Sequence, residues 1–253
     1  MPTLSVILIT RNEESSLDDC LASLEGIAQQ IVVVDSNSTD RTLEIAHNYG
    51  ALMAYPKDWP GFGPQKNRAL DLATGDWVLS LDADERLTPA LKSEILTAIN
   101  HSAHVNCFAI PRLSWYCGRF IRHSGWSPDY VERLFKRGTA RFSDDLVHER
   151  LIPNGTVAKL ENPMLHYSFM NYTQVLDKLN RYSTASAEQA FAQGKKSNPA
   201  KAVLHGMWAF IRTYILRAGF LDGPQGFALA ISNAHGTYYR YMKLWQLNQD
   251  AGK

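Results

Sequence analysis

Four short apolar runs recur through the first hundred residues, and this repetition constrains the fold more than any other feature of the chain. The runs at residues 4–10, 31–34 and 77–81 are rich in Val, Ile and Leu, and a third predicted strand in chain order lies near residues 51–55. Runs of this length without polar alternation are typical of strands buried on both faces. Between them lie stretches that predict helices, at residues 13–24, from the polar residues 35–40 to about 49, and at 65–73. This alternation predicts an α/β fold with a mostly parallel sheet and helices on both of its faces.

Polar residues follow three of these predicted strands. They stand at 11–13, 35–40 and 82–85. In an open parallel sheet, ligands bind in the crevice at the carboxyl ends of the strands. The sequence therefore predicts a ligand site built from these three segments.

The rest of the chain has a different pattern. Beyond about residue 101, Gly and Pro separate short strand-like runs, at residues 108–115, 119–122, 131–136 and 140–142. A long helix is predicted at 171–193, followed by a linker to Pro199 and a helical hairpin that turns at residues 222–224. We therefore expect one domain with the halves 1–100 and 101–170, and a helical C-terminal extension at 171–253.

The charge of the chain argues against a nucleic-acid binder. Its 253 residues carry 26 basic and 25 acidic side chains, a net charge of +1, whereas nucleic-acid-binding domains present clustered positive charge. The charge is unevenly placed, with a net of −5 over the first 170 residues and +6 from residue 171 onward. An acidic body with a basic tail indicates two tasks in one chain.

Cysteine usage and the lack of targeting segments favour a cytoplasmic protein. Cys20, Cys107 and Cys117 cannot all pair and form no CxxC motif, as expected of reduced thiols. The first residues lead directly into a strand pattern, so we expect no signal peptide. No charge-free apolar stretch reaches about 18 residues, so we expect no membrane-spanning helix.

The strongest local motif is Asp82-Ala83-Asp84, which directly follows a predicted buried strand. Two carboxylates at this spacing can hold a divalent cation, because Mg²⁺ and Mn²⁺ prefer oxygen ligands and usually take one or two protein carboxylates together with substrate phosphates. The alternative is a capped turn with solvated carboxylates.

Two further segments extend the predicted site. Asp35 ends the second strand, where its carboxylate can accept a hydrogen bond from the ring N–H of uracil or begin a turn and cap the next helix. Lys66 and Arg68 stand near a predicted helix start after a Gly-rich loop, a setting that suits phosphate. An ordinary solvated helix start is the alternative for that pair.

Two other nucleotide-binding signatures are missing. The chain has no GxxxxGK[ST] segment, which disfavours a P-loop phosphotransferase. Gly61-Phe62-Gly63 continues with Pro-Gln-Lys, so it is not a dinucleotide fingerprint.

Taken in order, these segments resemble family 2 glycosyltransferases. The resemblance rests on Ser5–Glu13, Ile31–Asp40, Lys66-Asn67 and Leu81–Asp84. Later segments, Phe142–Leu151, His166–Phe169 and Leu179–Ser183, resemble a narrower group of bacterial enzymes that add glucose to the heptose of the lipopolysaccharide inner core. The resemblance implies a GT-A fold, a UDP-sugar donor with UDP-glucose as the first expectation, inversion at the anomeric carbon, and a divalent Mg²⁺ or Mn²⁺. It makes residues 1–100 the nucleotide-sugar-binding half and 101–170 the acceptor and catalytic half.

The resemblance also assigns roles to the motif residues. Asp84 is expected to bind the metal, and Asp82 to contact the ribose or a metal-bound water. His166 is expected as a further metal or phosphate ligand, or as a packed histidine beside aromatic residues. The residues expected to bind the nucleotide are Thr10, Asn12, Glu13, Asp35, Lys66, Arg68, Asp82 and Arg181. Arg181 is equally well explained as a surface charge.

A carboxylate base is expected because a sugar hydroxyl is a poor nucleophile at neutral pH. We expect Glu149 in this role, with Asp145 and Asp144 as alternatives. In the competing interpretation the two aspartates solvate a loop, and Glu149 pairs with Arg150 or Arg133.

The last 53 residues combine nine aromatic side chains with interleaved basic ones. The apolar residues at helical spacing are Leu204, Met207, Trp208, Ile211 and Ile215. Such a pattern suits an anionic membrane surface, and we expect peripheral attachment to the cytoplasmic face of the inner membrane. Packing of this stripe within the chain or in a homodimer is the alternative.

Several rival functions stay open. A transferase of the same family can act on a polyprenyl phosphate or a capsular sugar. A nucleotidyltransferase shares the sheet topology, but the Gly-rich basic loop expected near its N-terminus is missing. A non-catalytic sugar-nucleotide sensor or scaffold is the rival from another class.

Overall fold

The computed structural model describes residues 1–102, 104–144 and 149–251. The chain forms two compact units. The first consists of Met1–Arg112 with Asp129–His166, and the second of Leu113–Pro128 with Tyr167–Lys253. The chain passes from one unit to the other within the strands β6 (Cys107–Tyr116) and β12 (Met164–Phe169) and at the start of β8 (Asp129–Lys136).

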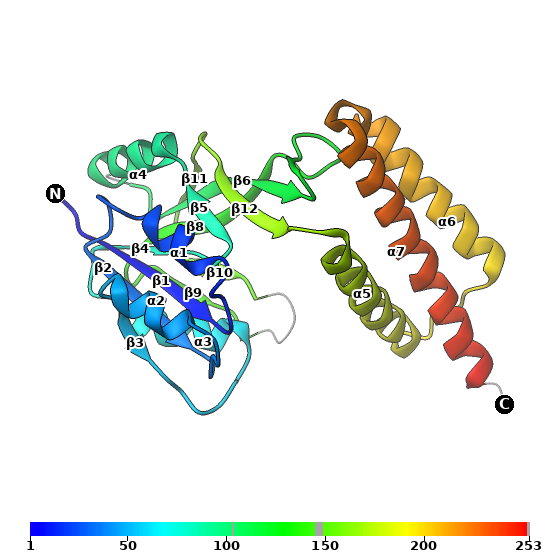
Figure 1. Cartoon of the computed structure of the whole chain (residues 1–253), viewed down its shortest axis with the longest axis horizontal. Helices are drawn as coiled ribbons and strands as arrows, with labels where there is room; N and C mark the ends of the chain where they lie inside the picture. Colours follow the sequence, from blue (N-terminus) through cyan, green and yellow to red (C-terminus); the bar gives the residue numbers. More distant parts are fainter. Residues whose placement is uncertain (103, 145–148, 252–253) are drawn as a thin grey trace. The chain divides into compact units, whose positions relative to one another are not determined.

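The first unit is built on a mixed sheet whose N-terminal part is parallel (Figure 1). Its first four strands lie in the order β3-β2-β1-β4 and are all parallel. They are β1 (Leu4–Thr10), β2 (Gln30–Asp35), β3 (Leu52–Ala54) and β4 (Trp77–Ser80). The register places Thr10 beside Asp35, so the polar residues after β1 and β2 meet at one edge of the sheet.

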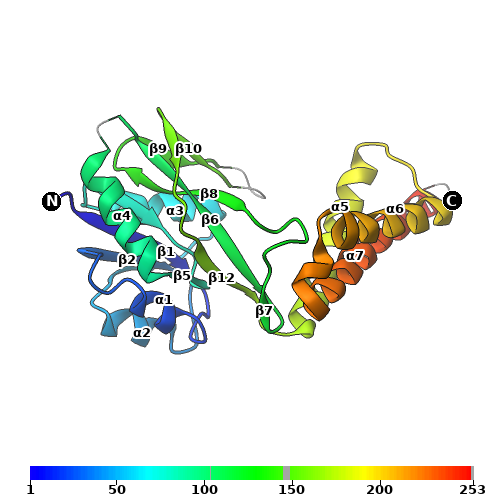
Figure 2. The ribbon, with the colours of Figure 1, turned by 90° about the horizontal axis from the view of Figure 1, so that it is seen from above.

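Beyond β4 the sheet continues with antiparallel neighbours. The order is β4-β8-β6-β12-β5, where β8 covers Asp129–Lys136 and β5 covers Glu85–Leu87. Figure 2 shows β6 and β12 running side by side. The shorter strands are β7 (Arg119–Phe120) and β11 (Val157–Lys159), which both pair with β6, and β9 (Ala140–Phe142) and β10 (Leu151–Pro153), which pair with each other.

Helices cover both faces of the parallel part of the sheet. They are α1 (Leu17–Ala22), α2 (Thr42–Asn48), α3 (Phe62–Asp71) and α4 (Pro89–His101). Alternate residues of β1 divide between the two cores, because strand side chains point to opposite faces. Leu4, Val6 and Leu8 pack with apolar residues of α1, α2 and α4, while Ile7 packs with those of α3.

Three of these helices differ in extent from the sequence prediction. The first occupies only part of the predicted range 13–24. The third begins at Phe62, before the predicted start at residue 65. No helix was expected at α4, although its N-terminus has a clear local cause: Thr88 Oγ1 accepts a hydrogen bond from the Leu91 N–H, and Pro89 stands at the first helical position.

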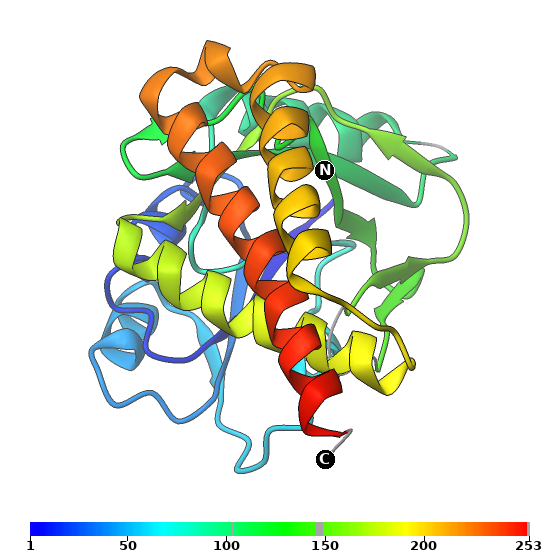
Figure 3. The same ribbon diagram turned by 90° about the vertical axis from the view of Figure 1, so that its right-hand side faces the viewer.

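The second unit is mainly helical (Figure 3). Its helices are α5 (Tyr172–Ala192), α6 (Pro199–Ile211) and α7 (Gly223–Asp250), and a π-helical turn, Arg212–Leu216, and a 3₁₀ turn, Gly219–Asp222, connect the last two. Close approach of α6 to α7 requires a small residue, since a Cβ at Gly206 would lie 3.3 Å from both the Ala234 carbonyl oxygen and the Tyr238 Cβ. The α/β fold class with a C-terminal helical hairpin is thus confirmed.

The turn before α7 is anchored by Asp222, which is buried. Its carboxylate accepts hydrogen bonds from the backbone N–H groups of Arg122 and His123 and from the Ser124 hydroxyl. Across the described residues, no helix combines the length and the apolar character needed to cross a bilayer.

Candidate active site

The ends of β1 and β2 are joined through the carboxylate of Asp35. Thr10 Oγ1 and Ser38 Oγ donate to its Oδ2 at 2.9 and 2.5 Å, and the Ser38 N–H donates to its Oδ1 at 2.8 Å. Asp35 has no exposed surface. Its carboxylate therefore stabilises the turn after β2, which is the turn role considered from the sequence, and a uracil N–H can reach it only if this turn opens.

Asn12 and Glu13 extend the same junction on the β1 side. The Asn12 N–H donates to Ser38 Oγ at 2.8 Å, and Asn12 Oδ1 accepts from the Thr39 N–H at 2.8 Å. The Glu13 N–H donates to Thr42 Oγ1 at 2.7 Å. Asn12 has a left-handed backbone conformation, with φ of 57°, which Asn tolerates better than most residues. These contacts fix the loop after β1 against the loop after β2.

The first turns of α3 are unusually buried for polar residues. Gln65, Lys66 and Asn67 are each at most 9% exposed, so the interpretation of an ordinary solvated helix start is wrong for Lys66. Asn67 exchanges two hydrogen bonds with the backbone of Phe142 on β9, at 2.9 and 3.0 Å. Gln65 Nε2 donates to Ser36 Oγ at 3.1 Å. The amides hold the helix in place, which leaves Lys66 as the charged group that it presents.

Asp82 lies between two cations. Lys66 Nζ is 3.0 Å from Asp82 Oδ1, and Arg133 Nη2 is 2.5 Å from Asp82 Oδ2. Burial opposes ionisation of this carboxyl, but Arg133 and Lys66 outweigh it and hold its pKa far below the usual range. Both oxygens of Asp82 thus already have charged partners from this chain.

Arg133 also binds Glu85, which has no exposed surface. Its Nη2 donates to Glu85 Oε1 at 2.7 Å, and Glu85 Oε2 accepts from the Asp82 N–H at 2.9 Å. Burial and the Asp82 charge raise the pKa of Glu85, while Arg133 opposes that rise. The Nε of Arg133 is buried and has no hydrogen-bond partner in the described part of the chain. Arg133 therefore ties the Asp82 turn to the strand that follows it.

The partner of Asp84 is a histidine, His166. Antiparallel pairing of β5 with β12 places His166 opposite Glu85, and His166 Nε2 lies 3.3 Å from Asp84 Oδ2. Both side chains are partly exposed. Two cis ligands of one Mg²⁺ or Mn²⁺ at about 2.1 Å would lie about 3.0 Å apart, so this pair has a separation that suits a shared ion. Among the described residues, no group of three or more His, Cys, Asp or Glu side chains forms a complete metal site, and a substrate phosphate would have to supply further ligands.

Glu13 shares the negative field of this region. Burial, followed by the charges of Asp84, Asp40 and Asp82, raises the pKa of its carboxyl to about 7. A carboxyl shifted in this way is a common feature of functional sites and also of crowded acidic surfaces. A bound cation would favour its ionised form.

Glu149 joins the site through Lys66, whose Nζ lies 3.4 Å from Glu149 Oε1. Lys66 therefore links Asp82 to the expected base. Arg133, one of the two partners considered for Glu149 in the competing interpretation, is instead occupied by Asp82 and Glu85. Asp144 is exposed, and Asp145 lies outside the described residues.

Two predicted nucleotide contacts are not part of this cluster. Arg68 pairs with Asp58 at 2.7 Å and donates to Gln65 Oε1 at 2.9 Å. Arg181 is exposed on α5 and belongs to the second unit. Arg133 and Glu85, in contrast, were not proposed as site residues. An arginine inside the predicted strand 131–136 is a usable signal, because a guanidinium that the strand buries requires carboxylate partners.

The arrangement separates two kinds of chemistry at the carboxyl edge of the sheet. Asp84 and His166 carry oxygen and nitrogen atoms that could hold a hard cation, while Lys66 provides a positive charge beside two carboxylates. A cation and an ammonium group together suit a diphosphate leaving group. Glu149 supplies a carboxylate near them that can accept a proton.

Comparison with known proteins gives results consistent with this geometry. Residues 5–159 match the sequence model of glycosyl transferase family 2. LpsC of Rhizobium meliloti, a lipopolysaccharide core biosynthesis glycosyltransferase, is 30% identical over 96% of this chain and 92% of its own length. An uncharacterized glycosyltransferase of Rickettsia typhi is 30% identical over 98% of this chain and 88% of its own. The crystal structure of a TarS fragment from S. aureus in complex with UDP is 17% identical, covers 98% of this chain and 92% of that fragment, and has a TM-score of 0.51. This likeness confirms the expected GT-A fold.

Proposed function

This chain belongs to glycosyltransferase family 2, and we propose that it moves a hexose, with glucose as the first choice, from a UDP-sugar to a heptose of the lipopolysaccharide inner core, with inversion. The observation that carries the proposal is the position of the Lys66 ammonium, 3.0 Å from Asp82 and 3.4 Å from Glu149. The name of the LpsC relative supports the acceptor class.

Asp84 and His166 are the residues that we propose as metal ligands, because their side-chain atoms stand 3.3 Å apart and both are accessible. A divalent ion held there would act as a Lewis acid on the leaving diphosphate. Asp82 has both oxygens engaged by cations, so we assign it the task of orienting Lys66 and contacting the donor's ribose. Lys66 then donates to diphosphate oxygens as negative charge gathers on them.

Glu149 is our choice for the base that removes the proton of the acceptor hydroxyl. Its carboxylate is only partly exposed and faces Lys66, so it is held in position without being buried. When the donor diphosphate draws Lys66 toward itself, Glu149 is released from that ion pair and can accept the proton. Asp144 remains the alternative within the described residues.

The proposed nucleotide pocket uses the junction of β1 with β2. Thr10, Asn12 and Asp35 form its hydrogen-bonded floor, and Glu13 stands at its acidic side. Contacts of Arg68 and Arg181 with the donor stay predictions. For Arg68 a donor phosphate would have to replace Asp58 as the partner of its guanidinium.

The test measures release of the nucleoside diphosphate (UDP, or GDP from GDP-mannose) and product linkage. The donors are UDP-glucose, UDP-galactose, UDP-N-acetylglucosamine and GDP-mannose, with truncated lipopolysaccharide cores as acceptors, with and without EDTA. We expect transfer from one UDP-sugar that EDTA abolishes, and loss of transfer in Asp84→Ala and Glu149→Gln. Asp144→Asn is the matched control for Glu149→Gln. Near-full transfer by Glu149→Gln would reject this base, and metal-independent transfer by the wild type would remove the role of Asp84.

The same measurements separate the rival functions. Transfer only to a polyprenyl phosphate or a capsular sugar would keep the reaction and replace the acceptor. Tight UDP-sugar binding without UDP release, with metal and every acceptor present, would identify a sensor or scaffold.

We also propose that the protein works at the cytoplasmic face of the inner membrane. The five stripe residues, from Leu204 to Ile215, are between 37% and 67% exposed, so they are free to meet a membrane or a second copy of the chain. Three free cysteines support a reducing compartment. Interleaved basic residues of this tail favour anionic lipid as the partner of the stripe, with a homodimer as the alternative.

A further inference from the structure

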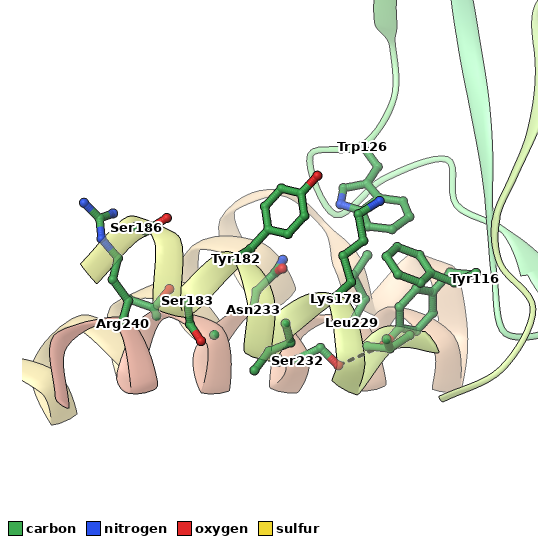
Figure 4. A pocket seen from close by; sticks show the side chains of 15 residues that line it. Tyr116, Trp126, Lys178, Tyr182, Ser183, Ser186, Leu229, Ser232, Asn233 and Arg240 are labelled. Carbon is green, nitrogen blue, oxygen red and sulfur yellow. Dashed lines mark hydrogen bonds between the residues drawn. The ribbon is translucent and has the colours of Figure 1, made fainter. Parts of the chain in front are cut away.

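A groove of about 420 Å³ runs along the second unit between α5 and α7 (Figure 4). All of its lining residues belong to this unit, and the proposed reaction uses none of them. One end is aromatic, formed by Tyr116, Trp126 and Phe169. The Tyr116 hydroxyl and Ser232 Oγ are 2.8 Å apart, which fixes the strand segment of the lining to α7.

Hydroxyl and amide side chains add polar groups to a lining that is otherwise mostly apolar. Besides Ser232, its hydroxyl and amide side chains are those of Ser183, Ser186, Asn233 and Thr237. Apolar side chains of α5 and α7, namely Val175, Leu179 and Leu229, belong to the same lining. The groove therefore offers both surface that packs against carbon and groups that form hydrogen bonds. Sites for small molecules combine these two kinds of surface.

The charge of the lining has a single sign. Lys178 and Arg240 are its charged residues, and the described residues of the lining include no carboxylate. Lys178 Nζ lies 4.8 Å from the Phe169 ring centroid and 5.7 Å from that of Tyr182, which is 61% exposed. Arg240 is exposed toward the other end of the groove (Figure 4). Arg and Lys beside open aromatic faces suit an anionic ligand with flat or ring-shaped apolar surfaces.

We propose that this groove binds a phosphorylated saccharide, namely the anionic sugar portion of the glycolipid acceptor. The proposal rests on the proposed function, because it names the acceptor class of that reaction. The aromatic faces pack against sugar rings, the hydroxyl and amide groups bond to sugar hydroxyls, and Lys178 and Arg240 bind phosphate. The two cations of the lining, Lys178 and Arg240, favour an anionic occupant over a lipid acyl chain, which has no group for them to bind.

Such a site holds the acceptor on the same chain as the catalytic unit and raises its effective concentration there. Loss of the site should therefore raise the KM for the acceptor and leave donor hydrolysis unchanged. Neither Lys178 nor Arg240 belongs to the proposed donor or metal site.

Binding to the full chain is measured by calorimetry, without donor or metal. The probes are a deacylated, phosphorylated lipopolysaccharide core oligosaccharide, the same oligosaccharide after phosphatase treatment, and dihexanoyl phosphatidylglycerol. We expect the phosphorylated oligosaccharide to bind the wild type, and Lys178→Gln and Arg240→Gln each to weaken it roughly tenfold. Lys195→Gln, which removes one exposed charge of the same unit away from the groove, is the control and should bind normally. Binding of the lipid alone, or equal binding of all variants, would overturn the proposal.

Transfer kinetics separate this proposal from the proposed function. If the wild type transfers sugar and the acceptor KM is unchanged in Lys178→Gln and Arg240→Gln, the groove is not the acceptor site. The proposed transferase function would then still stand. The opposite outcome is also possible: the wild type transfers no sugar, but it binds the oligosaccharide and both variants weaken this binding. That result would keep the groove as a saccharide site and reject the transferase reaction.

Discussion

Arg133 Nη2 donates to Asp82 Oδ2 at 2.5 Å, so the first carboxylate of the Asp82-Ala83-Asp84 motif is held by a buried guanidinium of the chain itself. Asp84, two residues later, faces His166. These residues form a turn between β4 and β5, and the turn gives the two aspartates different partners. We infer that they have different tasks, one in positioning and one in metal binding.

Substitution of Arg133 should destabilise the fold. Arg133→Met removes the guanidinium that donates to the buried Glu85 and leaves Arg112, whose Nη1 is 3.8 Å from Glu85 Oε1, as its neighbouring cation. Removing one partner of a buried ion pair costs about 3–5 kcal/mol, and Arg112 places the expected loss at the lower end, about 3 kcal/mol. We expect the free energy of unfolding, measured in urea, to fall by about that amount. Arg133→Lys keeps the charge and should lose less.

A double variant checks that the cause is the uncompensated carboxylate. Glu85→Gln combined with Arg133→Met removes both charges and should recover part of the stability lost in Arg133→Met alone. Additive losses would show that Arg133 acts through packing and not through Glu85.

The two aspartates should differ in their effect on metal affinity. Asp84→Asn removes a proposed ligand, and we expect Mn²⁺ binding in the presence of UDP to weaken by on the order of a hundredfold. Asp82→Asn changes only a neighbouring positioning group and should weaken it by roughly tenfold. Calorimetric titration of both variants with Mn²⁺ gives the comparison, and a larger loss in Asp82→Asn would reverse the assignment.

Glu13 should make stability depend on pH in a defined direction. Its pKa is raised from 4.5 to about 7 in the folded chain. Below about pH 4.5 the carboxyl of Glu13 is protonated in both the folded and the unfolded chain, so it does not lower the free energy of unfolding. Between pH 4.5 and 7 the ionisation of Glu13 in the unfolded chain lowers the free energy of unfolding progressively, and above pH 7 this loss is constant. Glu13→Gln should therefore raise the free energy of unfolding at pH 8 by roughly 1–2 kcal/mol after solvent screening, and leave it unchanged at pH 4.

Urea unfolding at the two pH values measures this difference, with Glu14→Gln as the neighbouring control. An equal gain at pH 4 and pH 8 would show that the effect comes from hydrogen bonding or packing. Addition of Mn²⁺ and UDP should reduce the gain at pH 8, because a cation near Glu13 favours its ionised form.

Two glycines should respond in opposite ways to alanine. A Cβ at Gly63 would lie 1.8 Å from the Ser143 carbonyl oxygen, so Gly63→Ala must displace the segment that leads to Glu149. At Gly236 the nearest atom would be 3.5 Å away, and Ala is better than Gly within a helix by about 1 kcal/mol. Thermal unfolding should show a lower Tm for Gly63→Ala and an equal or higher one for Gly236→Ala. The same sign for both would contradict the close contact at α3.

Local sequence patterns predicted the parallel half of the sheet because β1, β2 and β4 are continuous, mostly buried apolar runs with helices around them. The edge strand β3 is not buried, since Leu52 is 47% exposed. The run at residues 4–10 coincides with β1. In contrast, β5 and β12 were not anticipated, since each is short or mixed in polarity and is stabilised by pairing with the other. Pairing between segments about eighty residues apart leaves no local periodicity to detect.

The site shows the same division. Asp82, Asp84 and Lys66 could be proposed from motif and spacing, and the structure brings Lys66 to Asp82. The partnership of Arg133 with Glu85 could not, because it depends on β8 lying next to β4. Sequence reasoning also could not reveal that Asp35 is fully buried, since burial depends on the neighbouring loop.

The exposed stripe of α6 predicts binding to anionic membranes. Leu204 and Trp208 are 67% and 53% exposed, and replacement of either by Glu introduces a charge that an anionic, apolar surface disfavours. We expect the wild type to co-sediment with phosphatidylglycerol vesicles at low salt, and Leu204→Glu and Trp208→Glu to remain in the supernatant. Ala200→Glu adds the same charge at an exposed position near the start of α6 and serves as the control. If the wild type fails to sediment with vesicles and instead elutes as a dimer that Leu204→Glu dissociates, the stripe binds a second copy of this chain and the membrane assignment is wrong.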